Sequence, residues 1–481
     1  MENIVSLLEL LVKGLNEAET KFFENPKDFY SLESSVKSTT EEFAAKYLGL
    51  ILSSINSQIK KDAWRKANYK IQRNDKRTLI TSVGDVVFDS TYFKNKKGDY
   101  HYLIEDMIGL AAHDRFSEGA EVMLLTEALK TSYEEATKVL PSKAKITKTT
   151  VMNKVHGIAE ELPEEISETK KKVKYLFIEA DEDHVAEQHG RWNEKKDNSS
   201  FISKLAYVYE YKKESEKCKD KKELVNTFYF SGVYDNTKGV EKFWNNVEKF
   251  ICNNYEIEDI EKVYISGDGA NWIKSGTDYV SKSVFCADKF HLMKYINKAS
   301  NQMLDESEIA KSEIYRLLYK RKRKRLKEYL DGMSECANNP EPVEVLKTYV
   351  VNNWNAVMLC LHEEVVDGCS AEGHVSSVLS DRLSSRPKGW SKTGADRMSK
   401  LRCYERNYGR GKIIELVKYS RERRKLERTG TDDIPVKELT LHEILREHSN
   451  KSRGYIDNIQ ATVPGITTRK IFSIRNQIKM I

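Results

Sequence analysis

The spacing of apolar residues predicts a helix and then a small β-sheet near the start of the chain. Between Phe43 and Ile59 apolar residues recur at helical spacing, so we expect one face of this helix to pack on a core. Residues 78–94 favour strands, and Asn95-Lys96-Lys97-Gly98 supplies a turn before residues 100–104. The first region, 1–110, is therefore expected to be helical with a β-hairpin.

The next region, 111–165, has the pattern of two short helices. Residues 133–140 and 149–157 flank a polar connection, and Thr147 is suited to cap the second helix. The arrangement is similar to a helix-turn-helix, in which the start of the second helix reads DNA base edges. A helical hairpin inside a core would show the same pattern, and that alternative stays open. The candidate DNA-contacting residues are Lys148, Thr149, Thr150 and Asn153.

The middle of the chain predicts a mixed sheet. Residues 173–180 are almost continuously apolar, as in a strand buried on both faces. The predicted order is three strands, a helix, a strand, a helix, a strand and a helix. This order is typical of an α/β, ribonuclease H-like fold and does not fit repeated βαβ units. The remaining segments of this order are strands 203–211, 226–234, 262–266 and 283–286, and helices 240–251, 272–280 and 290–298.

The residues that follow are predicted to be a helical insertion and then a return to the same domain. The basic run 320–325 in the insertion is either solvated surface or a phosphate-contacting face. We expect a ribonuclease H-like mixed-sheet catalytic domain, interrupted by helices and preceded by a mainly helical DNA-binding region. Its expected parts are a first core segment at 171–300, the insertion at 301–365, a second core segment at 366–403, and a tail at 404–481.

Charge and composition narrow the classes of protein. The net charge is +6, but residues 404–481 alone carry 17 Lys and Arg against 10 Asp and Glu, so the rest is near neutral. A basic tail suggests a polyanionic partner. The alternative is that the tail is simply a solvated segment that binds no partner. No stretch is suited to span a membrane or to act as a secretory signal, which predicts a cytoplasmic, nucleoid-associated protein. The seven cysteines form no metal-binding pairs, so reduced thiols are expected.

Three acidic residues fall where they could share metal ions. Asp181 directly follows the first predicted strand, Asp268 follows the fourth, and Glu372 begins a late helix. In a ribonuclease H-like sheet the first and fourth strands are neighbours, so the two aspartates would meet at one edge. Crowded carboxylates need cations, and hard oxygen ligands suit Mg²⁺ or Mn²⁺. Two such ions could activate a water or 3′-hydroxyl and stabilise the leaving oxygen of a phosphoryl displacement.

Several motifs together resemble the ISLre family of bacterial insertion-sequence transposases. They are the apolar strand with Asp181, the segment GDGANWI, the segment DKFHL, and SAEGH followed by SRPKGWS. The resemblance implies an Asp-Asp-Glu enzyme that cleaves and joins DNA at terminal inverted repeats, acting as a homo-oligomer on DNA. It implies Asp181, Asp268 and Glu372 as metal ligands, with Asp288 and His291 as an accessory pair. Asp183 stays open as an alternative to Asp181.

Arginines near Glu372 are candidates for holding DNA phosphates, because the guanidinium fork suits that task. Solvated surface arginines are the alternative, and Trp390 is expected in the core. Residues 1–160 are predicted to bind the terminal repeats. The candidate arginines are Arg382, Arg386, Arg397 and Arg402.

Two other functions compete with the transposase hypothesis. Asp181-Glu182-Asp183 also resembles the nucleophile motif of haloacid-dehalogenase-like phosphatases, in which the second aspartate is the general acid. Trp272 stands where that family's metal loop would supply another acid. A non-catalytic DNA-binding protein derived from a transposase is the other alternative, although such a protein has no need of three converging carboxylates.

Overall fold

Two units contain the residues that the computed structural model describes, which are 4–111, 114–163, 169–188, 199–215, 222–386 and 388–429. The first unit is formed by Met1–Lys154 and Val417–Ile481, and the second by Val155–Leu416. Each unit has its own buried apolar residues.

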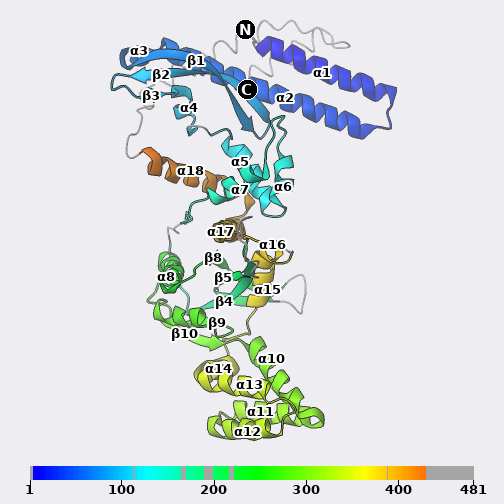
Figure 1. Cartoon of the computed structure of the whole chain (residues 1–481), viewed down its shortest axis with the longest axis vertical. Helices are drawn as coiled ribbons and strands as arrows, with labels where there is room; N and C mark the ends of the chain where they lie inside the picture. Colours follow the sequence, from blue (N-terminus) through cyan, green and yellow to red (C-terminus); the bar gives the residue numbers. More distant parts are fainter. Residues whose placement is uncertain are drawn as a thin grey trace. The chain divides into compact units, whose positions relative to one another are not determined.

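Two long helices and a hairpin begin the first unit (Figure 1). Helix α1 (Ile4–Glu24) packs on α2 (Phe29–Lys61), whose N-terminus is capped by the Asp28 carboxylate. Helix α2 lies on strand β2 (Gly84–Asn95), which pairs with β1 (Tyr69–Thr81). Contact between α2 and β2 requires a glycine, because a Cβ at Gly49 would lie 2.3 Å from the carbonyl oxygen of Val87.

The predicted helix 43–59 is confirmed within α2. A β-hairpin is present as predicted, but its main strands are β1 and β2. The first half of β1 is polar and exposed, so its sequence lacks the apolar alternation of a half-buried strand. The segment predicted as a strand at 100–104 is two-residue β3 (Tyr100–His101) followed by helix α4 (Leu103–Met107).

Short helices complete the first unit. They are α3 (Ala63–Asn68), α5 (Glu118–Ala128), α6 (Tyr133–Ala136) with the 3₁₀ turn Thr137–Val139, and α7 (Lys148–His156). The predicted first helix of the pair is therefore a single turn and a 3₁₀ turn. Its connection to α7 is longer than the turn of a helix-turn-helix, which has about 3–4 residues. The predicted cap is confirmed, since Thr147 Oγ1 accepts a 3.3 Å hydrogen bond from the Thr150 amide.

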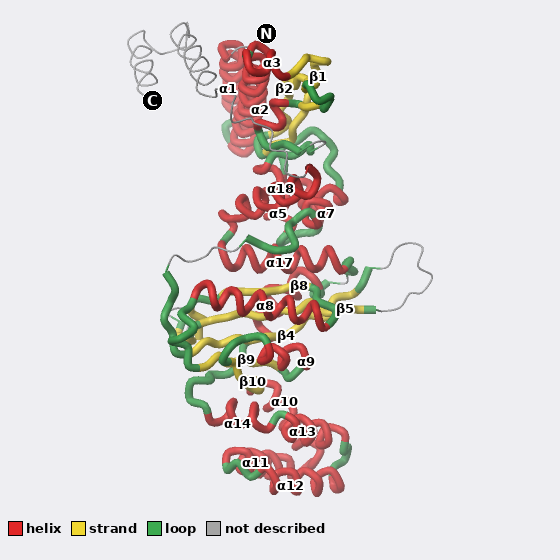
Figure 2. Tube along the Cα trace, turned by 90° about the vertical axis from the view of Figure 1, so that its left-hand side faces the viewer, coloured by secondary structure: helices red, strands yellow, loops and turns green. Residues whose placement is uncertain are grey.

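A five-stranded mixed sheet organises the second unit (Figure 2). Strand β4 is parallel to β9, and β9 to β10, whereas β5 is antiparallel to both β4 and β8. In chain order the strands are therefore arranged 3-2-1-4-5, and the predicted contact between the first and fourth strands is confirmed. The strands are β4 (Tyr175–Ala186), β5 (Ser200–Tyr209), β8 (Phe228–Gly232), β9 (Lys262–Gly267) and β10 (Ser283–Ala287).

Alternation along β4 separates an apolar face from an acidic face. Leu176, Ile178 and Ala180 pack with residues of helix α8 (Thr237–Asn254), whose Trp244 is fully buried. The short helix α15 (Ala371–Val375) lies on β4, and Figure 1 shows α8 and α15 on opposite sides of the sheet. The acidic face of β4 is thus turned toward the Glu372 segment.

The predicted helical insertion is confirmed as four helices after α10 (Lys289–Ser300). Their buried side chains form one core with Cys286 and Ala287 of β10, so the insertion packs directly on the edge of the sheet. The four helices are α11 (Ser307–Tyr319), α12 (Arg323–Cys336), α13 (Glu341–Asn352) and α14 (Trp354–His362).

The predicted helix 272–280 is shorter than expected, because α9 spans only Asn271–Lys274 before a 3₁₀ turn. The charged connection after β5 forms its own hairpin of β6 (Tyr211–Glu214) and β7 (Lys222–Val225). The six cysteines in the described ranges are free, and Cys218 lies outside them. In the described part of the chain, no helix is both long and apolar enough to cross a membrane.

The beginning of the predicted tail is helical. The last part of the second unit is a π-helical segment, Ser376–Ser380, with α16 (Asp381–Leu383) and α17 (Lys392–Tyr408). Helix α18 (Ile413–Thr429) follows, and from Val417 onward it belongs to the first unit. Residues 430–481 of the predicted tail lie outside the described residues.

Candidate functional site

Three aspartates lie in one row across the three parallel strands, Asp181 inside β4 and Asp268 and Asp288 directly after β9 and β10. Glu179 of β4 pairs with Ser266 of β9, so Asp181 and Asp268, each two residues further on, are next in register. Ala287 of β10 pairs with Gly267, which places Asp288 beside Asp268. This register places Asp181 and Asp268 on neighbouring strands at one end of the sheet, and their shared role as metal ligands stays a prediction. The carboxyl ends of parallel strands are also where open α/β sheets bind ligands.

Asp181 is inside β4 and does not directly follow it, which corrects the predicted strand end. Pairing of β4 with β9 ends before Asp181, but pairing with β5 continues to Ala186. The apolar run ends at Ala180, and residues 181–184 are all polar, so the sequence did not distinguish this part of the strand from a loop.

Electrostatic repulsion marks this row of acids. Burial, together with the negative charge of nearby Asp268, raises the pKa of Asp181 to about 6. The Nδ1 atom of His291 lies 2.5 Å from Asp288 Oδ2. This hydrogen bond, with the charges of Asp268 and Asp181, raises the pKa of His291 above its ordinary value. The predicted accessory pair therefore lies beside the two aspartates.

The loop after β9 fits closely against β4. A Cβ at Gly267 would lie 2.7 Å from the carbonyl oxygen of Ala180, so a side chain here would push Asp268 away from Asp181. Gly269 has a φ of 97°, which favours glycine. Asp268 Oδ1 accepts a 2.8 Å hydrogen bond from the amide of Ala270 and is thereby oriented.

Tyr349 of the helical insertion reaches this loop. Its Cε2 atom lies 3.6 Å from the position that a Cβ on Gly269 would occupy. The charges of Asp288 and Asp268, after burial, raise the pKa of Tyr349. The Tyr349 hydroxyl is buried and has no hydrogen-bond partner among the described residues. Sequence patterns gave no signal for this residue, since it lies far from the acids in the chain.

The segment that carries Glu372 is attached to β4 at two points. The first is the buried carboxylate of Glu179, which accepts hydrogen bonds from the Ser370 amide at 2.6 Å and from the Ser370 hydroxyl at 2.9 Å. The second is Asp183 Oδ1, which accepts from the hydroxyls of Ser380 at 3.0 Å and Ser384 at 2.8 Å. Residues 179, 181 and 183 share one face of the strand, so the segment crosses the face of Asp181.

Glu179 is a site residue that the sequence did not reveal. Its side chain is 1% exposed, and Lys212 Nζ lies 2.8 Å away. Burial would raise its pKa, but Lys212 and hydrogen bonds from Tyr207 and Ser370 hold it below the ordinary value. Lys212 also donates to the carbonyls of Asp367 and Gly368, so this ion pair fixes the start of the Glu372 segment.

Glu372 itself is exposed, whereas its neighbour His374 faces the sheet. The His374 ring lies 4.4 Å from that of Tyr207, and its Nδ1 is 2.9 Å from the Tyr229 hydroxyl. The structure therefore places the Glu372 helix on β4 but does not place its carboxylate against the two aspartates. Among the described residues no three His, Cys, Asp or Glu side chains are arranged to hold a metal ion. Glu372 as a third ligand stays a prediction.

Asp183 is held by the second attachment and is 7% exposed. Burial raises its pKa, opposed by the two serine hydroxyls. Because Asp183 faces Ser380 and Ser384, its visible contacts are structural. Its Oδ2 atom has no hydrogen-bond partner among the described residues.

The four candidate arginines have different environments. Arg402 is buried and donates to the carbonyls of Val378 at 2.5 Å and Ser377 at 2.8 Å. Arg382 is 6% exposed and lies over the ring of Trp390, which is in the core as expected. Arg397 donates to Asp396, and Arg386 is exposed. Contact with DNA stays a prediction for all four, and only Arg386 presents an exposed side chain for it.

The four residues proposed to read DNA lie at the start of α7. Lys148, Thr149 and Asn153 are exposed and Thr150 is partly exposed, whereas Val151 and Lys154 are buried. This face of α7 is open to solvent, as a base-reading helix requires.

These features define a mixed α/β protein with neighbouring carboxylates at the ends of parallel strands. The chain belongs to the uncharacterised protein family UPF0236, whose model matches residues 23–420. A UPF0236 protein of Caldanaerobacter subterraneus subsp. tengcongensis is 35% identical over 421 residues, covering 86% of this chain and 83% of the relative. A Streptococcus gallolyticus UPF0236 protein, named for the vanSb 3′ region, is 22% identical and covers 80% and 85%.

A solved structure, the Drosophila P element transposase strand transfer complex, matches 76% of this chain and 92% of its own chain. The TM-score is 0.22 and the identity 12%, so no conclusion is based on this match. The family model and the relatives therefore place this chain in UPF0236, and its resemblance to ISLre transposases stays a hypothesis.

Proposed function

We propose that this protein is a DNA transposase that cleaves and joins DNA strands by metal-dependent phosphoryl transfer. The observation that carries the proposal is the placement of Asp181 and Asp268 in register on neighbouring parallel strands, with the Glu372 segment attached across the same face. The 3-2-1-4-5 strand order, with β5 antiparallel to its neighbours, supports a ribonuclease H-like catalytic domain.

The acidic row fits divalent cations of the Mg²⁺ or Mn²⁺ type. Burial and, to a lesser extent, the charge of Asp268 raise the pKa of Asp181; a cation would compensate the negative charge of both groups, and carboxylate oxygens are suitable ligands. Asp181, Asp268 and Glu372 would hold two ions, which would activate a water or 3′-hydroxyl and stabilise the leaving oxygen. The Asp288–His291 pair is placed to position a group beside Asp268.

Completion of this ligand set requires Glu372 to move toward Asp181. The helix that carries Glu372 has five residues and continues into the π-helical segment, a form of helix found often at functional sites. Both attachments on β4 lie outside α15, at Ser370 and at Ser380 with Ser384. A rotation of α15 between them would leave both attachments intact.

Two further observations support DNA as the substrate. The start of α7 is exposed and polar, with Lys148 beside Thr149. One Caldanaerobacter relative has a name that joins eleven locus labels, and another has a name that joins four. Several loci for one protein in one genome are expected of a gene that is copied by transposition. Terminal inverted repeats as the bound sequence, and a homo-oligomer on DNA, are part of the proposal.

The test is strand cleavage and joining by the full chain on DNA carrying the element's ends, with Mg²⁺ or Mn²⁺. We expect Asp181→Asn, Asp268→Asn and Glu372→Gln each to lower joining by about a hundredfold or more, since each removes ligand charge but keeps side-chain shape. Near-normal joining by Asp268→Asn or Glu372→Gln would overturn the Asp-Asp-Glu assignment.

Asp183→Asn is the matched control, because it makes the same chemical change two residues from Asp181. It should keep most of the joining activity, since an amide oxygen can still accept from Ser380 and Ser384. DNA binding should survive all four changes. Loss with Asp183→Asn but not with Asp181→Asn would shift the first ligand by two residues.

The other two functions are less well supported. A phosphatase of the haloacid dehalogenase type would need Asp183 as a general acid, but this carboxyl group is buried and accepts from two serines. A non-catalytic DNA-binding protein would bind the ends with all variants alike and would show no metal-dependent joining. The same assay therefore separates this function from a transposase.

A further inference from the structure

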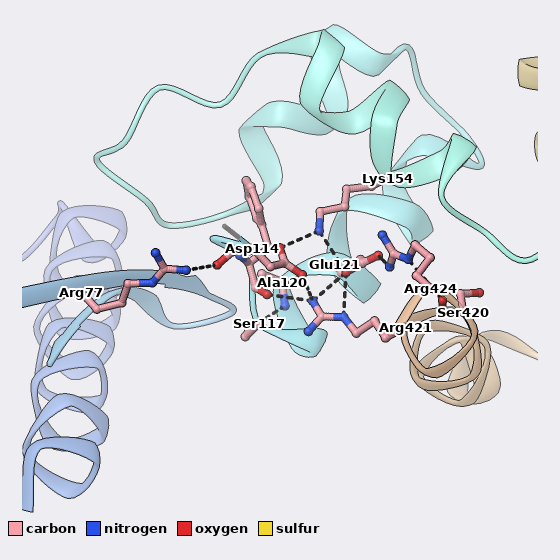
Figure 3. A network of polar contacts seen from close by, with 10 residues as sticks. Arg77, Asp114, Ser117, Ala120, Glu121, Lys154, Ser420, Arg421 and Arg424 are labelled. Carbon is pink, nitrogen blue, oxygen red and sulfur yellow. Dashed lines mark hydrogen bonds and ion pairs between the residues drawn. The ribbon is translucent and has the colours of Figure 1, made fainter. Parts of the chain in front are cut away.

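A buried carboxylate joins three helices of the first unit (Figure 3). Glu121 of α5 is 2% exposed, and its Oε2 atom accepts hydrogen bonds from Arg421 Nε at 3.0 Å and Nη2 at 2.7 Å. Lys154 of α7 donates to the same oxygen at 3.2 Å. A carboxylate this deeply buried is tolerated only when cations and hydrogen bonds compensate for lost water. Glu121 therefore needs both α7 and α18.

A second acid strengthens the connection. Lys154 Nζ lies 3.0 Å from Asp114 Oδ1, and Arg421 Nη2 lies 3.5 Å from Asp114 Oδ2. Arg421 also donates to the carbonyl of Phe116 at 2.8 Å. Arg421 is thus bonded to two successive parts of the N-terminal segment, although 300 positions separate it from Glu121. Helix α18 is a built-in part of the first unit from Val417 onward.

The basic residues of α18 lie on two faces of the helix, one turned toward α5 and one turned to solvent. Val417 and Ser420 are buried on the face toward α5, and Arg421 and Arg424 reach Glu121 from that face. The network holds Lys154, Arg421 and the partly exposed Arg424 around the carboxylates of Glu121 and Asp114. Three more basic residues are exposed on the helix surface, namely Lys418, Arg423 and Lys425.

We propose that α18 is a second contact element for duplex DNA, held with α7 in one binding unit by Glu121. The proposal rests on the proposed function, which makes DNA the partner. Exposed lysines and arginines on a helix contact phosphates and carry no sequence information by themselves. The polar start of α7, with Thr149 and Asn153, is the part suited to base edges. The DNA-binding unit therefore includes both an N-terminal segment and α18, and residues 1–160 alone are not sufficient.

The test removes the exposed charge of α18 in the full chain. The variant Lys418→Gln/Arg423→Gln/Lys425→Gln is compared with Lys172→Gln/Lys174→Gln/Lys238→Gln, which removes three exposed charges from the second unit, outside the segment proposed to bind DNA. Affinity for a duplex of unrelated sequence is measured over a series of salt concentrations. Each lost phosphate contact lowers the slope of log K against log salt by about 0.9, so three lower it by about 2.7.

We expect the α18 variant to bind at least about tenfold more weakly near 0.1 M salt with the lower slope, and the control to match the unchanged protein. Equal slopes for the two variants, with intact binding by the unchanged protein, would overturn the inference and leave the proposed function standing. A protein that binds no duplex DNA in any form would instead overturn the proposed function. Tighter binding to single-stranded RNA, lost in the α18 variant, would overturn the choice of partner.

The role of Glu121 is tested by Glu121→Gln, which removes one of the two carboxylates that compensate Lys154 and Arg421 and the carboxylate that faces Arg424. We expect lower thermal stability and weaker duplex binding together. Because this variant could lose its fold for structural reasons alone, Arg424→Gln is measured beside it. Arg424 lies at the edge of the network at 3.4 Å, and its loss should affect stability less. Unchanged stability and DNA binding with Glu121→Gln would contradict the proposed connection.

Discussion

At the scale of single residues, the acidic row shows how neighbouring carboxylates change one another. Asp181 and Asp268 lie in register at the ends of two parallel strands, and Asp288 continues the row. Glycine at 267 permits the close fit of the Asp268 loop against β4. Tyr349 adds a buried hydroxyl that has no hydrogen-bond partner in the described part of the chain, and the charges of Asp288 and Asp268 act on it. A buried hydroxyl without a partner costs stability, so its presence requires another explanation.

Tyr349→Phe tests whether this hydroxyl serves the site. The change removes only the oxygen, and because that oxygen has no partner, stability should stay the same or rise by up to about 1–3 kcal/mol. We expect strand joining to fall about tenfold or more, because our hypothesis is that the hydroxyl donates to a phosphate or water bound beside the acids. The measurements are thermal unfolding and joining activity. A fall in both stability and activity would show a structural role and contradict this prediction.

The pKa of Asp181 predicts how stability depends on pH without divalent cations. Folded Asp181 keeps its proton up to about pH 6, whereas the unfolded chain releases it near 3.8. Between these values only the folded state holds the proton, so its contribution to stability is lost as pH rises through this window. With a chelator present, the free energy of unfolding of Asp181→Asn should lack the decrease that titration of Asp181 causes in the unchanged protein between these two pH values. If the free energy of unfolding depended on pH in the same way in the unchanged protein and in Asp181→Asn, the raised pKa of Asp181 would be contradicted.

At the scale of elements, the Glu372 segment depends on β4 more than on its own helical preference. Helix α15 has five residues, and helices this short are not stable alone. The hydrogen bonds to Glu179 and Asp183 supply the stabilisation that the short sequence of α15 does not. Arg402 adds to this by donating to carbonyls of the π-helical segment.

Ser380→Ala/Ser384→Ala removes the second attachment and leaves the buried Asp183 carboxylate without these two donors. We expect the free energy of unfolding to fall by about 1–3 kcal/mol and joining to fall with it, because the segment that carries Glu372 loses one of its two attachments to β4. Ser377→Ala/Ser385→Ala is the matched control, since neither hydroxyl contacts β4. Chemical denaturation and the joining assay give both values, and equal effects of the two double variants would argue against the attachment.

At the scale of the whole molecule, each unit has a separate apolar core. Phe93 belongs to the core of the first unit and Phe243 to that of the second, and both are essentially unexposed. Burial of one phenylalanine contributes several kcal/mol, so a cavity should weaken the unit that contains it.

Phe93→Ala and Phe243→Ala should therefore shift different thermal transitions. We expect calorimetry to resolve two transitions, of which each variant lowers one, with a loss of about 3–5 kcal/mol in the affected unit. The two variants make the same chemical change and serve as controls for each other. A single transition that both variants lower equally would show that the units unfold together.

The sequence by itself determined the elements whose pattern is local. Helix α2, the buried strand β4 up to Ala180, and the succession of strands and helices along the chain all follow from apolar periodicity, which depends on near neighbours in the chain. The neighbouring positions of the first and fourth strands were expected from the ribonuclease H-like fold class. Asp268 could also be found, because a glycine-flanked acid directly after an apolar strand marks a strand end. The polar half of β1 was not recovered, since its residues carry little apolar signal. The helix predicted at 133–140 is present only as the short α6 and a 3₁₀ turn.

Only the tertiary structure decided which distant residues meet. Glu179 is 191 positions from Ser370, and Glu121 is 300 from Arg421, yet each buried carboxylate organises its part of the fold. No periodicity can show such a pair, because the free energy of burying a charge depends on partners supplied by the fold. The sequence predicted Asp181 beside Asp268 because both residues belong to strands expected to pair. It could not predict that Glu372 is turned to solvent, because the orientation of that side chain depends on distant contacts of the folded chain.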